Sequence, residues 1–276
     1  MKYTLENDEI IYLNIQDFSL EETFLCGQAF RFDPFEKGFK GFMAGALCYV
    51  RYEGENLWVQ VLNVPITEEL VGAIYHFLAL DIDYATLKKK FSQDETLKKA
   101  IEYARGIRVL NQGFFETLIT FIISQNNNIP RIKKLADTLA QRYGSSAQDS
   151  FAFPTAEQLK EVTQQDYMDM KFGFRAKYLY DAVQKVVSGE IKEENIKAMT
   201  YPDAKNYLMQ IKGVGPKVAD CVLLFSCEKY ESFPHDVWIN RAMEIMFPEG
   251  LPQVCCGYEG IAQQYIFHYA RFNIKK

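Results

Sequence analysis

The sequence contains no long apolar run, and its first residues do not predict a secretory signal. Hydrophobic residues make up 48% of its 276 positions, but the longest apolar runs, such as residues 120–123, are far shorter than the roughly 20 residues of a membrane-spanning helix. The first residues are acidic and lack the basic-then-apolar layout of a signal peptide. We therefore expect a folded, cytoplasmic protein without membrane association.

Cysteine and histidine are too few and too scattered for a metal site. The six cysteines include no C-x-x-C pair, and the three histidines, His76, His235 and His268, lie far apart. Zinc and iron–sulfur sites need closely spaced ligands of these types. A chain of this length also needs no disulfide framework. We expect reduced thiols, no metal and no dissociable cofactor.

Positive charge is also in the minority. The chain has 31 Lys and Arg against 36 Asp and Glu, a formal net charge of -5. This balance argues mildly against nucleic acid as a partner, because phosphate binding depends on clustered cations. The acidic excess, however, lies within the first 70 residues, and the potential at a binding face matters more than the total charge.

Secondary-structure signals divide the chain. Residues 41–52 and 56–62 are β-branched and aromatic runs around Glu53-Gly54-Glu55, which predicts a hairpin. A capping-type start at residues 66–69 opens a helix through residue 78. Further helices are predicted at 94–105, 114–125, 130–143, 176–188, 201–210, 216–227, 236–246 and 259–272. The pattern predicts an α+β protein with a small antiparallel β domain (1–80) and a larger all-helical domain (81–276).

The segment 208–221 contains the sharpest local pattern. Gly213 can end one helix, Gly215 can adopt the left-handed conformation of a tight turn, and Pro216 suits the first position of the next helix. This predicts a helix-hairpin-helix, in which the backbone N–H groups of Gly213, Val214 and Gly215 bind a phosphate without regard to base sequence. A plain helix–helix turn is the alternative.

Two ionisable residues near this hairpin could carry chemistry. Lys217, in the first turn of the second helix, is a candidate nucleophile for a Schiff base, although a solvated surface lysine gives the same pattern. Asp236 follows 19 residues later, after a Pro-x pair and before an amphipathic helix, where an N-cap is common. Beside a nucleophilic amine, its carboxylate can instead stabilise positive charge that develops on a sugar.

Two other segments carry groups suited to nucleobases. Asn126, Asn127 and Asn128 form an amide-rich loop between two predicted helices. Phe174 and Arg175 place an aromatic wedge beside a cation. Each segment can also have a purely structural role, as an ordinary Asn turn in the first case and as a buried Phe with a solvated Arg in the second.

Together these motifs resemble the 8-oxoguanine DNA glycosylase/AP lyase family of the helix-hairpin-helix DNA glycosylase superfamily. The matching segments, in order, are 26–31, 124–129, 173–178, 213–221 and 234–237. The resemblance runs from about residue 10 to residue 271. It implies a bifunctional repair enzyme that binds damaged double-stranded DNA, flips out 8-oxoguanine, excises it through a lysine Schiff base and cleaves the abasic strand by β-elimination. We expect a monomer, nucleoid-associated if the host is bacterial.

The resemblance also implies a role for each site residue. Lys217 becomes the nucleophile at the anomeric carbon and Asp236 its carboxylate partner. Gly27 supplies the carbonyl that accepts the ring hydrogen distinguishing 8-oxoguanine from guanine. The other implied contacts are Cys221 and Phe267 on the two faces of the flipped base, Gln263 on its edge, Asn126, Arg131 and Arg175 on the orphaned cytosine, and Phe174 in the opened base step.

Two positions depart from the family pattern. Phe174 stands where better-known members of the family carry a tyrosine, so the wedge lacks a hydroxyl. Trp238 stands where those members carry a histidine that touches phosphate.

Three alternatives remain: a monofunctional alkylbase glycosylase that uses water and the same Asp236, a non-catalytic helix-hairpin-helix module that binds DNA or protein, and a helical enzyme of small-molecule metabolism. Lys217 and Asp236 together favour the bifunctional enzyme.

Overall fold

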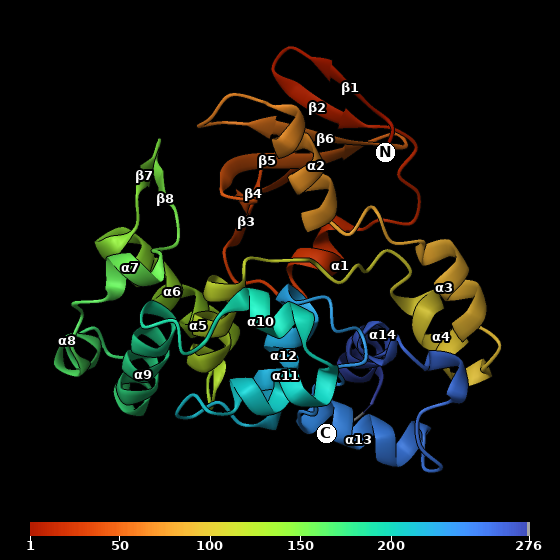
Figure 1. Ribbon diagram of the computed structural model, residues 1–276. Helices are drawn as coiled ribbons and strands as arrows, with labels where there is room; N and C mark the ends of the chain where they lie inside the picture. The colour runs from red at the N-terminus through yellow and green to blue at the C-terminus, as the bar shows by residue number, and fades with distance from the viewer. Residues whose placement is uncertain (275–276) are drawn as a thin grey trace.

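The computed structural model describes residues 1–274 and confirms the predicted α+β class (Figure 1). The N-terminal part forms a six-stranded antiparallel sheet with the spatial order β1-β2-β6-β5-β4-β3. Its strands are β1 (Tyr3–Glu6), β2 (Glu9–Tyr12), β3 (Phe32–Phe35), β4 (Gly38–Met43), β5 (Ala46–Glu53) and β6 (Asn56–Val61).

The strand predicted over residues 41–52 is in fact two strands. Ala44 and Gly45 have φ angles of 48° and 80°, so the chain reverses between β4 and β5. A two-residue hairpin turn with positive φ at both positions matches the twist of the flanking strands. The predicted hairpin between β5 and β6 is confirmed, with Glu53 paired to Asn56.

Helices make up most of the remaining chain, and every predicted helix is present. Five helices were not predicted: α1 (Leu20–Phe24), α3 (Tyr84–Phe91), α7 (Ala156–Leu159), α8 (Gln164–Asp169) and α10 (Glu193–Ala198). The predicted ones are α2 (Glu68–Phe77), α4 (Glu95–Tyr103), α5 (Phe114–Ser124), α6 (Ile129–Tyr143), α9 (Ala176–Val187), α11 (Tyr201–Leu208), α12 (Pro216–Ser226), α13 (Val237–Met246) and α14 (Glu259–Asn273). Short elements are the 3-10 turns η1 (Gly173–Arg175) and η2 (Gln253–Cys255) and the hairpin β7 (Ser146–Ala147) and β8 (Ser150–Phe151).

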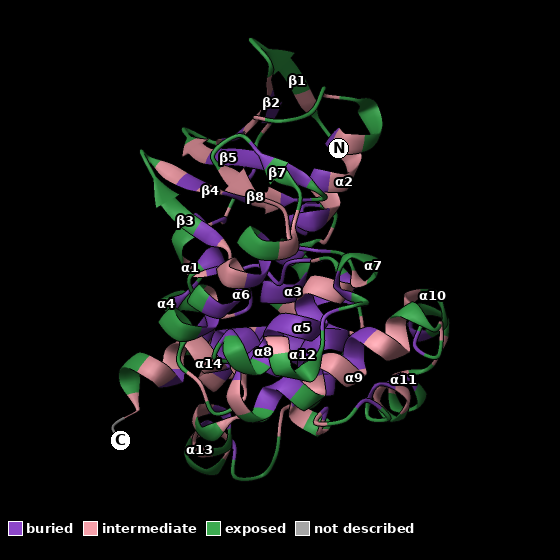
Figure 2. Ribbon diagram, turned by 90° about the vertical axis from the view of Figure 1, so that its left-hand side faces the viewer, coloured by how far each residue is buried: buried purple, intermediate pink, exposed green. Residues whose placement is uncertain are grey.

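The apolar side chains form two clusters. One lies between the sheet and α2 and includes Ile10, Val50 and Ile74, each 0% exposed. The other surrounds α5 and α12, which pack against each other in the centre of the helical part and are mostly buried (Figure 2). Burying these faces supplies most of the stabilising free energy. The domain boundary at residue 80 stays a prediction.

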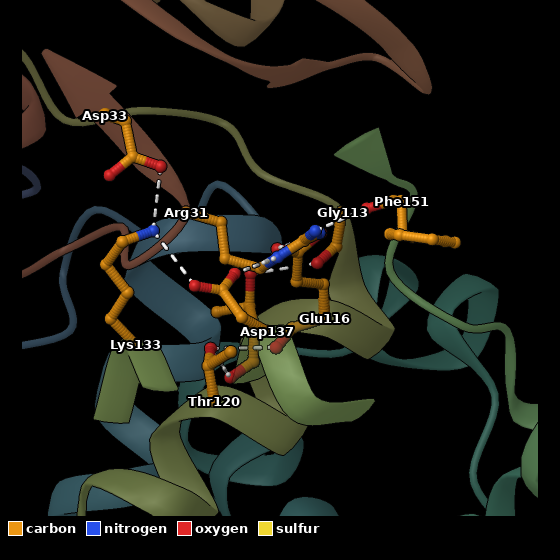
Figure 3. A network of polar contacts seen from close by, with 9 residues as sticks. Arg31, Asp33, Gly113, Glu116, Thr120, Lys133, Asp137 and Phe151 are labelled. Atoms are coloured by element: carbon orange, nitrogen blue, oxygen red, sulfur yellow. Dashed lines mark hydrogen bonds and ion pairs between the residues drawn. The ribbon is translucent and has the colours of Figure 1, made fainter. Parts of the chain in front are cut away.

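Arg31, just before β3, ties the sheet to the helical part (Figure 3). Its Nε lies 3.3 Å from Asp137 Oδ1 on α6, and its Nη2 donates to the Phe151 carbonyl in β8. Lys133 of α6 extends the network, with its Nζ 2.9 Å from Asp33 and 3.1 Å from Asp137. These contacts hold the segment 26–31 against α6, whose N-terminal turn carries Arg131.

Within residues 1–274, none of the helices is long and apolar enough to cross a bilayer. Within the same residues, no group of three or more His, Cys, Asp and Glu side chains is placed to hold a metal ion.

Candidate active site

The hairpin between α11 and α12 turns at Gly213, not at Gly215. Gly213 has a φ of +79°, and a Cβ added there would lie 2.3 Å from the Tyr178 ring, so no larger residue fits without displacing that ring. Gly215 is extended, with φ -92° and ψ -179°, and serves as the N-cap of α12 ahead of Pro216. The prediction of a left-handed Gly215 is therefore wrong, whereas the first-turn position of Pro216 is confirmed.

The hairpin presents only part of the expected phosphate site. The Val214 N–H donates to the Ile211 carbonyl at 3.0 Å and is already engaged. A Cβ added at Gly215 would meet no heavy atom within 4 Å, so a phosphate can approach the backbone there. Gly213, Gly215 and the positive N-terminal end of α12 are the groups that suit an anion, and their phosphate contact stays a prediction.

Lys217 and Asp236 lie at the starts of two neighbouring helices. Lys217 is half-buried in the first turn of α12, and its Nζ lies 5.3 Å from the centre of the Phe121 ring on α5. Asp236 is the N-cap of α13, and its Oδ1 accepts a hydrogen bond of 2.8 Å from the Ile239 N–H. The capping role expected for Asp236 is thus confirmed, and the cap uses Oδ1 and not Oδ2.

Two cavities meet at this pair. The first is narrow and is lined by Cys26, Gly27, Phe121, Lys217, Cys221, Phe225, Pro234, Asp236, Gln263, Gln264 and Phe267. The second is an open groove lined by residues 124–128, Arg131, Lys217 and residues 235–238. Lys217 and Asp236 are the two residues common to both linings. The amine and the carboxylate therefore stand where the narrow cavity opens into the groove.

The narrow cavity is lined by apolar groups and by the side-chain amide of Gln263, which a hydrogen bond orients. Cys221 is buried, which raises the pKa of its thiol to about 11, and at neutral pH the group is an uncharged, polarisable surface. The half-buried Phe267 and the buried Gln263 come from α14. Gln263 Nε2 donates to the Pro234 carbonyl at 2.9 Å. The structure thus brings the predicted base-binding residues into one cavity.

Gly27 reaches this cavity from the N-terminal part of the chain. Its φ of +96° belongs to the left-handed region, where a residue with a side chain is strained. The following residue, Gln28, is 1% exposed and anchors the segment. Its Nε2 donates to the Arg108 carbonyl at 2.7 Å, and its Oε1 accepts from the Leu110 N–H at 2.8 Å.

Of the residues predicted to face the opposite strand, Asn126 and Arg131 line the groove, whereas Phe174 and Arg175 do not. Asn126 is exposed with a φ of 52°, and the exposed Arg131 donates from Nη2 to the Lys171 carbonyl at 3.4 Å. Arg175, however, is 2% exposed. Its guanidinium donates to the carbonyls of Gln125 and Asn126, the latter at 3.0 Å. In this state Arg175 supports the asparagine loop, and direct contact with a cytosine requires it to exchange partners.

Phe174 lies beside Arg175 and is well placed for a wedge. Its side chain is 49% exposed, and its ring lies 4.5 Å from the Arg175 guanidinium carbon.

Burial, and then the charge of Arg131, lowers the pKa of Arg175. A partner rich in hydrogen-bond acceptors would stabilise these two positive charges.

Some lining residues were not predicted. Phe121 and Phe225 are apolar members of α5 and α12 that no motif distinguishes from core residues. Gln264 donates from Nε2 to Gln263 Oε1 at 2.6 Å, and its only sequence signal is its place beside Gln263. The sequence predicts no role for Pro234 beyond its place before Asp236, whereas in the structure its carbonyl orients Gln263.

Comparisons with known families divide the chain in two. Residues 10–118 match the N-terminal domain of 8-oxoguanine DNA glycosylase. Residues 119–249 match the HhH-GPD superfamily of base excision DNA repair proteins. The two matched regions are adjacent and cover both cavities except for the residues of α14.

Comparisons with individual proteins agree. The crystal structure of Clostridium acetobutylicum 8-oxoguanine glycosylase/lyase, in complex with double-stranded DNA containing cytosine opposite 8-oxoguanine, has 36% sequence identity and a TM-score of 0.91, covering 99% of this chain and 98% of that one. The N-glycosylase/DNA lyase of Saccharomyces cerevisiae is 38% identical over 154 residues, or 50% of this chain and 41% of that protein. The Arabidopsis thaliana N-glycosylase/DNA lyase is 32% identical over 238 residues, 80% and 65% of the respective chains. The matches thus span less than two thirds of the length of these two eukaryotic relatives.

Proposed function

Because this chain belongs to the 8-oxoguanine DNA glycosylase family of the HhH-GPD superfamily, we propose that it excises 8-oxoguanine from double-stranded DNA and cleaves the resulting abasic strand. The observation that carries this proposal is the place of Lys217 and Asp236 at the mouth between the narrow cavity and the groove. A nucleotide flipped out of DNA has its base in a pocket and its phosphates outside. The sugar therefore lies at the mouth, beside the amine and the carboxylate.

The reaction follows from these two groups. Lys217 Nζ attacks the anomeric carbon as the glycosidic bond breaks, and the base leaves with the bonding electrons and takes up a proton. Positive charge that develops on the sugar is stabilised by the Asp236 carboxylate. The nitrogen then loses one proton, and the C1′–O4′ bond breaks as the ring oxygen takes up a proton. This opens the sugar ring and leaves a protonated imine between Lys217 and the former anomeric carbon.

The same imine permits strand cleavage. It acidifies the hydrogen on the neighbouring C2′ atom, and removal of that proton expels the 3′ phosphate by β-elimination. Water then hydrolyses the imine and returns the free amine of Lys217. One lysine thus serves both the glycosylase and the lyase step, and neither step uses a metal ion or a dissociable cofactor.

Base recognition is assigned to groups in the narrow cavity. Since Gln263 Nε2 is engaged by the Pro234 carbonyl, its Oε1 is the end that can turn to the base. That oxygen has two lone pairs, one of which serves Gln264. The remaining lone pair can accept from the N1–H donor of a guanine-type base, whereas adenine has an acceptor at N1. The Gly27 carbonyl accepts the N7 hydrogen of the oxidised base, and Cys221 and Phe267 cover its faces.

Two groove residues, Asn126 and Arg131, and the nearby Phe174 and Arg175 are assigned to the opposite strand. Phe174 enters the base step, Asn126 fills the space left by the lesion, and Arg131 and Arg175 donate to the acceptors of the orphaned cytosine. The Clostridium acetobutylicum relative was crystallised on DNA with cytosine opposite the lesion, which supports this choice of partner. Action as a monomer and a cytoplasmic, nucleoid-associated location in a bacterial host stay predictions.

The alternatives are weaker. A non-catalytic module has no use for an amine and a carboxylate at a cavity mouth. A monofunctional alkylbase glycosylase needs no amine at position 217, and the N-terminal match over residues 10–118 is to 8-oxoguanine glycosylases. The direct test is incubation with a duplex that holds a single 8-oxoguanine opposite cytosine. We expect release of the base and a strand break at the lesion, and an intact duplex would contradict the proposal.

A further inference from the structure

Arg271 does not line the narrow cavity but contacts two residues that do, Cys26 and Phe267. It follows Phe267 by four residues on α14, so its side chain points back over that ring. The guanidinium carbon lies 5.4 Å from the centre of the Phe267 ring, within the range of a cation–π contact. Its Nη1 donates to the Cys26 carbonyl at 3.4 Å.

The two partners of Arg271 belong to opposite parts of the chain. Phe267 covers the cavity from the C-terminal helix, and Cys26 directly precedes Gly27 in the N-terminal part. No carboxylate within residues 1–274 forms an ion pair with Arg271, whose other close partner is the exposed Phe272 ring at 5.7 Å. The guanidinium is therefore used to join these two walls, not to neutralise an acid.

The Gly27 carbonyl depends on its neighbours for its direction. Glycine has no side chain to restrain it, and both adjacent peptide groups must be fixed if the carbonyl is to stay aimed into the cavity. Gln28 fixes the following side through the hydrogen bonds to Arg108 and Leu110. The bond from Arg271 to the Cys26 carbonyl fixes the preceding side.

We propose that Arg271 is a positioning residue for lesion recognition, which holds the Phe267 ring and the Gly27 carbonyl in the arrangement that a flipped 8-oxoguanine requires. The inference rests on the proposed function and adds a residue to it. Its role is confined to steps in which the base occupies the cavity. Cleavage of a DNA strand that already lacks the base uses Lys217 at the mouth and does not depend on Arg271.

This separation defines the experiment. Arg271→Met keeps a long apolar side chain but removes both the hydrogen bond and the cation–π contact. We expect single-turnover excision of 8-oxoguanine to fall tenfold or more, the scale of losing one charge-assisted hydrogen bond and one cation–π contact. Cleavage of a duplex with a preformed abasic site should proceed at the wild-type rate. Arg271→Lys keeps the charge and a hydrogen-bond donor but loses the planar face of the guanidinium. Its rate of 8-oxoguanine excision should lie between those of Arg271→Met and the wild type.

Arg142→Met is the matched control. Arg142 is an exposed residue in the last turn of α6, far along that helix from Arg131, so the variant removes the same charge without touching the cavity. It should match the wild type on both substrates. Equal activity of Arg271→Met and wild type on 8-oxoguanine would overturn the inference, and so would an equal loss on both substrates. A wild-type protein that excises no 8-oxoguanine would instead overturn the proposed function.

Discussion

The Gln263 side-chain amide donates to the Pro234 carbonyl at 2.9 Å and so connects helix α14 to the segment that carries Asp236. This bond occupies the nitrogen of the amide. It leaves Oε1, already an acceptor from Gln264, as the end that the proposed function assigns to the base. Under that proposal, a single contact links base recognition to the position of the Asp236 carboxylate.

Gln263→Ala should impair excision without impairing strand cleavage. The variant loses the acceptor for the base and leaves the Pro234 carbonyl without its partner. We expect excision of 8-oxoguanine to fall tenfold or more, since each lost or unpaired buried hydrogen-bonding group costs about 1–3 kcal/mol. Cleavage of preformed abasic DNA should continue. Unchanged excision in a single-turnover assay would show that the amide does not read the base.

Asp236→Asn should separate the structural role of this residue from its chemical role. The asparagine Oδ1 can still accept from the Ile239 N–H and cap α13, but the negative charge facing the sugar is lost. We expect the melting temperature to change little and the glycosylase rate to fall about a hundredfold, as for loss of a preorganised electrostatic group. A variant that unfolds would instead assign Asp236 to the structure alone.

Arg131→Met should flatten the preference for the base opposite the lesion. Arg131 is exposed in the groove, so it can donate to cytosine without leaving buried partners unpaired. Adenine presents a different acceptor pattern, and each unpaired donor costs about 1–3 kcal/mol. The check is single-turnover excision from four duplexes with each base opposite 8-oxoguanine. Equal rates for the wild type on all four would remove opposite-base reading from the account.

The reactivity of the buried Cys221 thiol should depend strongly on pH. Burial raises the pKa of Cys221 to about 11, so its reactive thiolate is scarce at neutral pH and increases as pH rises toward that value. In a Cys256→Ser variant, which lacks the exposed thiol, alkylation of Cys221 by iodoacetamide should accelerate about tenfold per pH unit from near neutral to about pH 9. Mass spectrometry of the peptides measures this. Rapid, pH-independent labelling of Cys221 would contradict a buried neutral thiol.

The elements predicted best from sequence are those with strong local signals. The helices around the hairpin and the β5–β6 turn follow from glycine, proline and hydrophobic periodicity. The short α1 and the exposed β1 and β3 have weak patterns and depend on pairing with distant residues, as in the sheet order β1-β2-β6-β5-β4-β3. The Ala44-Gly45 turn was missed because alanine rarely adopts the positive φ observed there.

The residues of the site show the same contrast between local sequence signals and long-range packing. Lys217 and Asp236 were found because motifs mark them, and the structure brings them to one cavity mouth. The left-handed conformation predicted for Gly215 was wrong. The positive φ is found at Gly213, where the close approach of the Tyr178 ring comes from another helix. The burial of Arg175 and the contacts of Arg271 likewise depend on long-range packing, which local sequence does not specify.

Covalent trapping tests the central claim, that Lys217 is the nucleophile. Borohydride reduces an imine to a stable amine, so wild-type protein mixed with duplex DNA containing 8-oxoguanine should give a cross-linked protein–DNA adduct whose modified peptide contains Lys217. Lys217→Gln cannot form the imine and should bind the duplex without being trapped. Strong trapping of the Lys217→Gln variant, or an adduct mapped to another lysine of the wild type, would contradict the account.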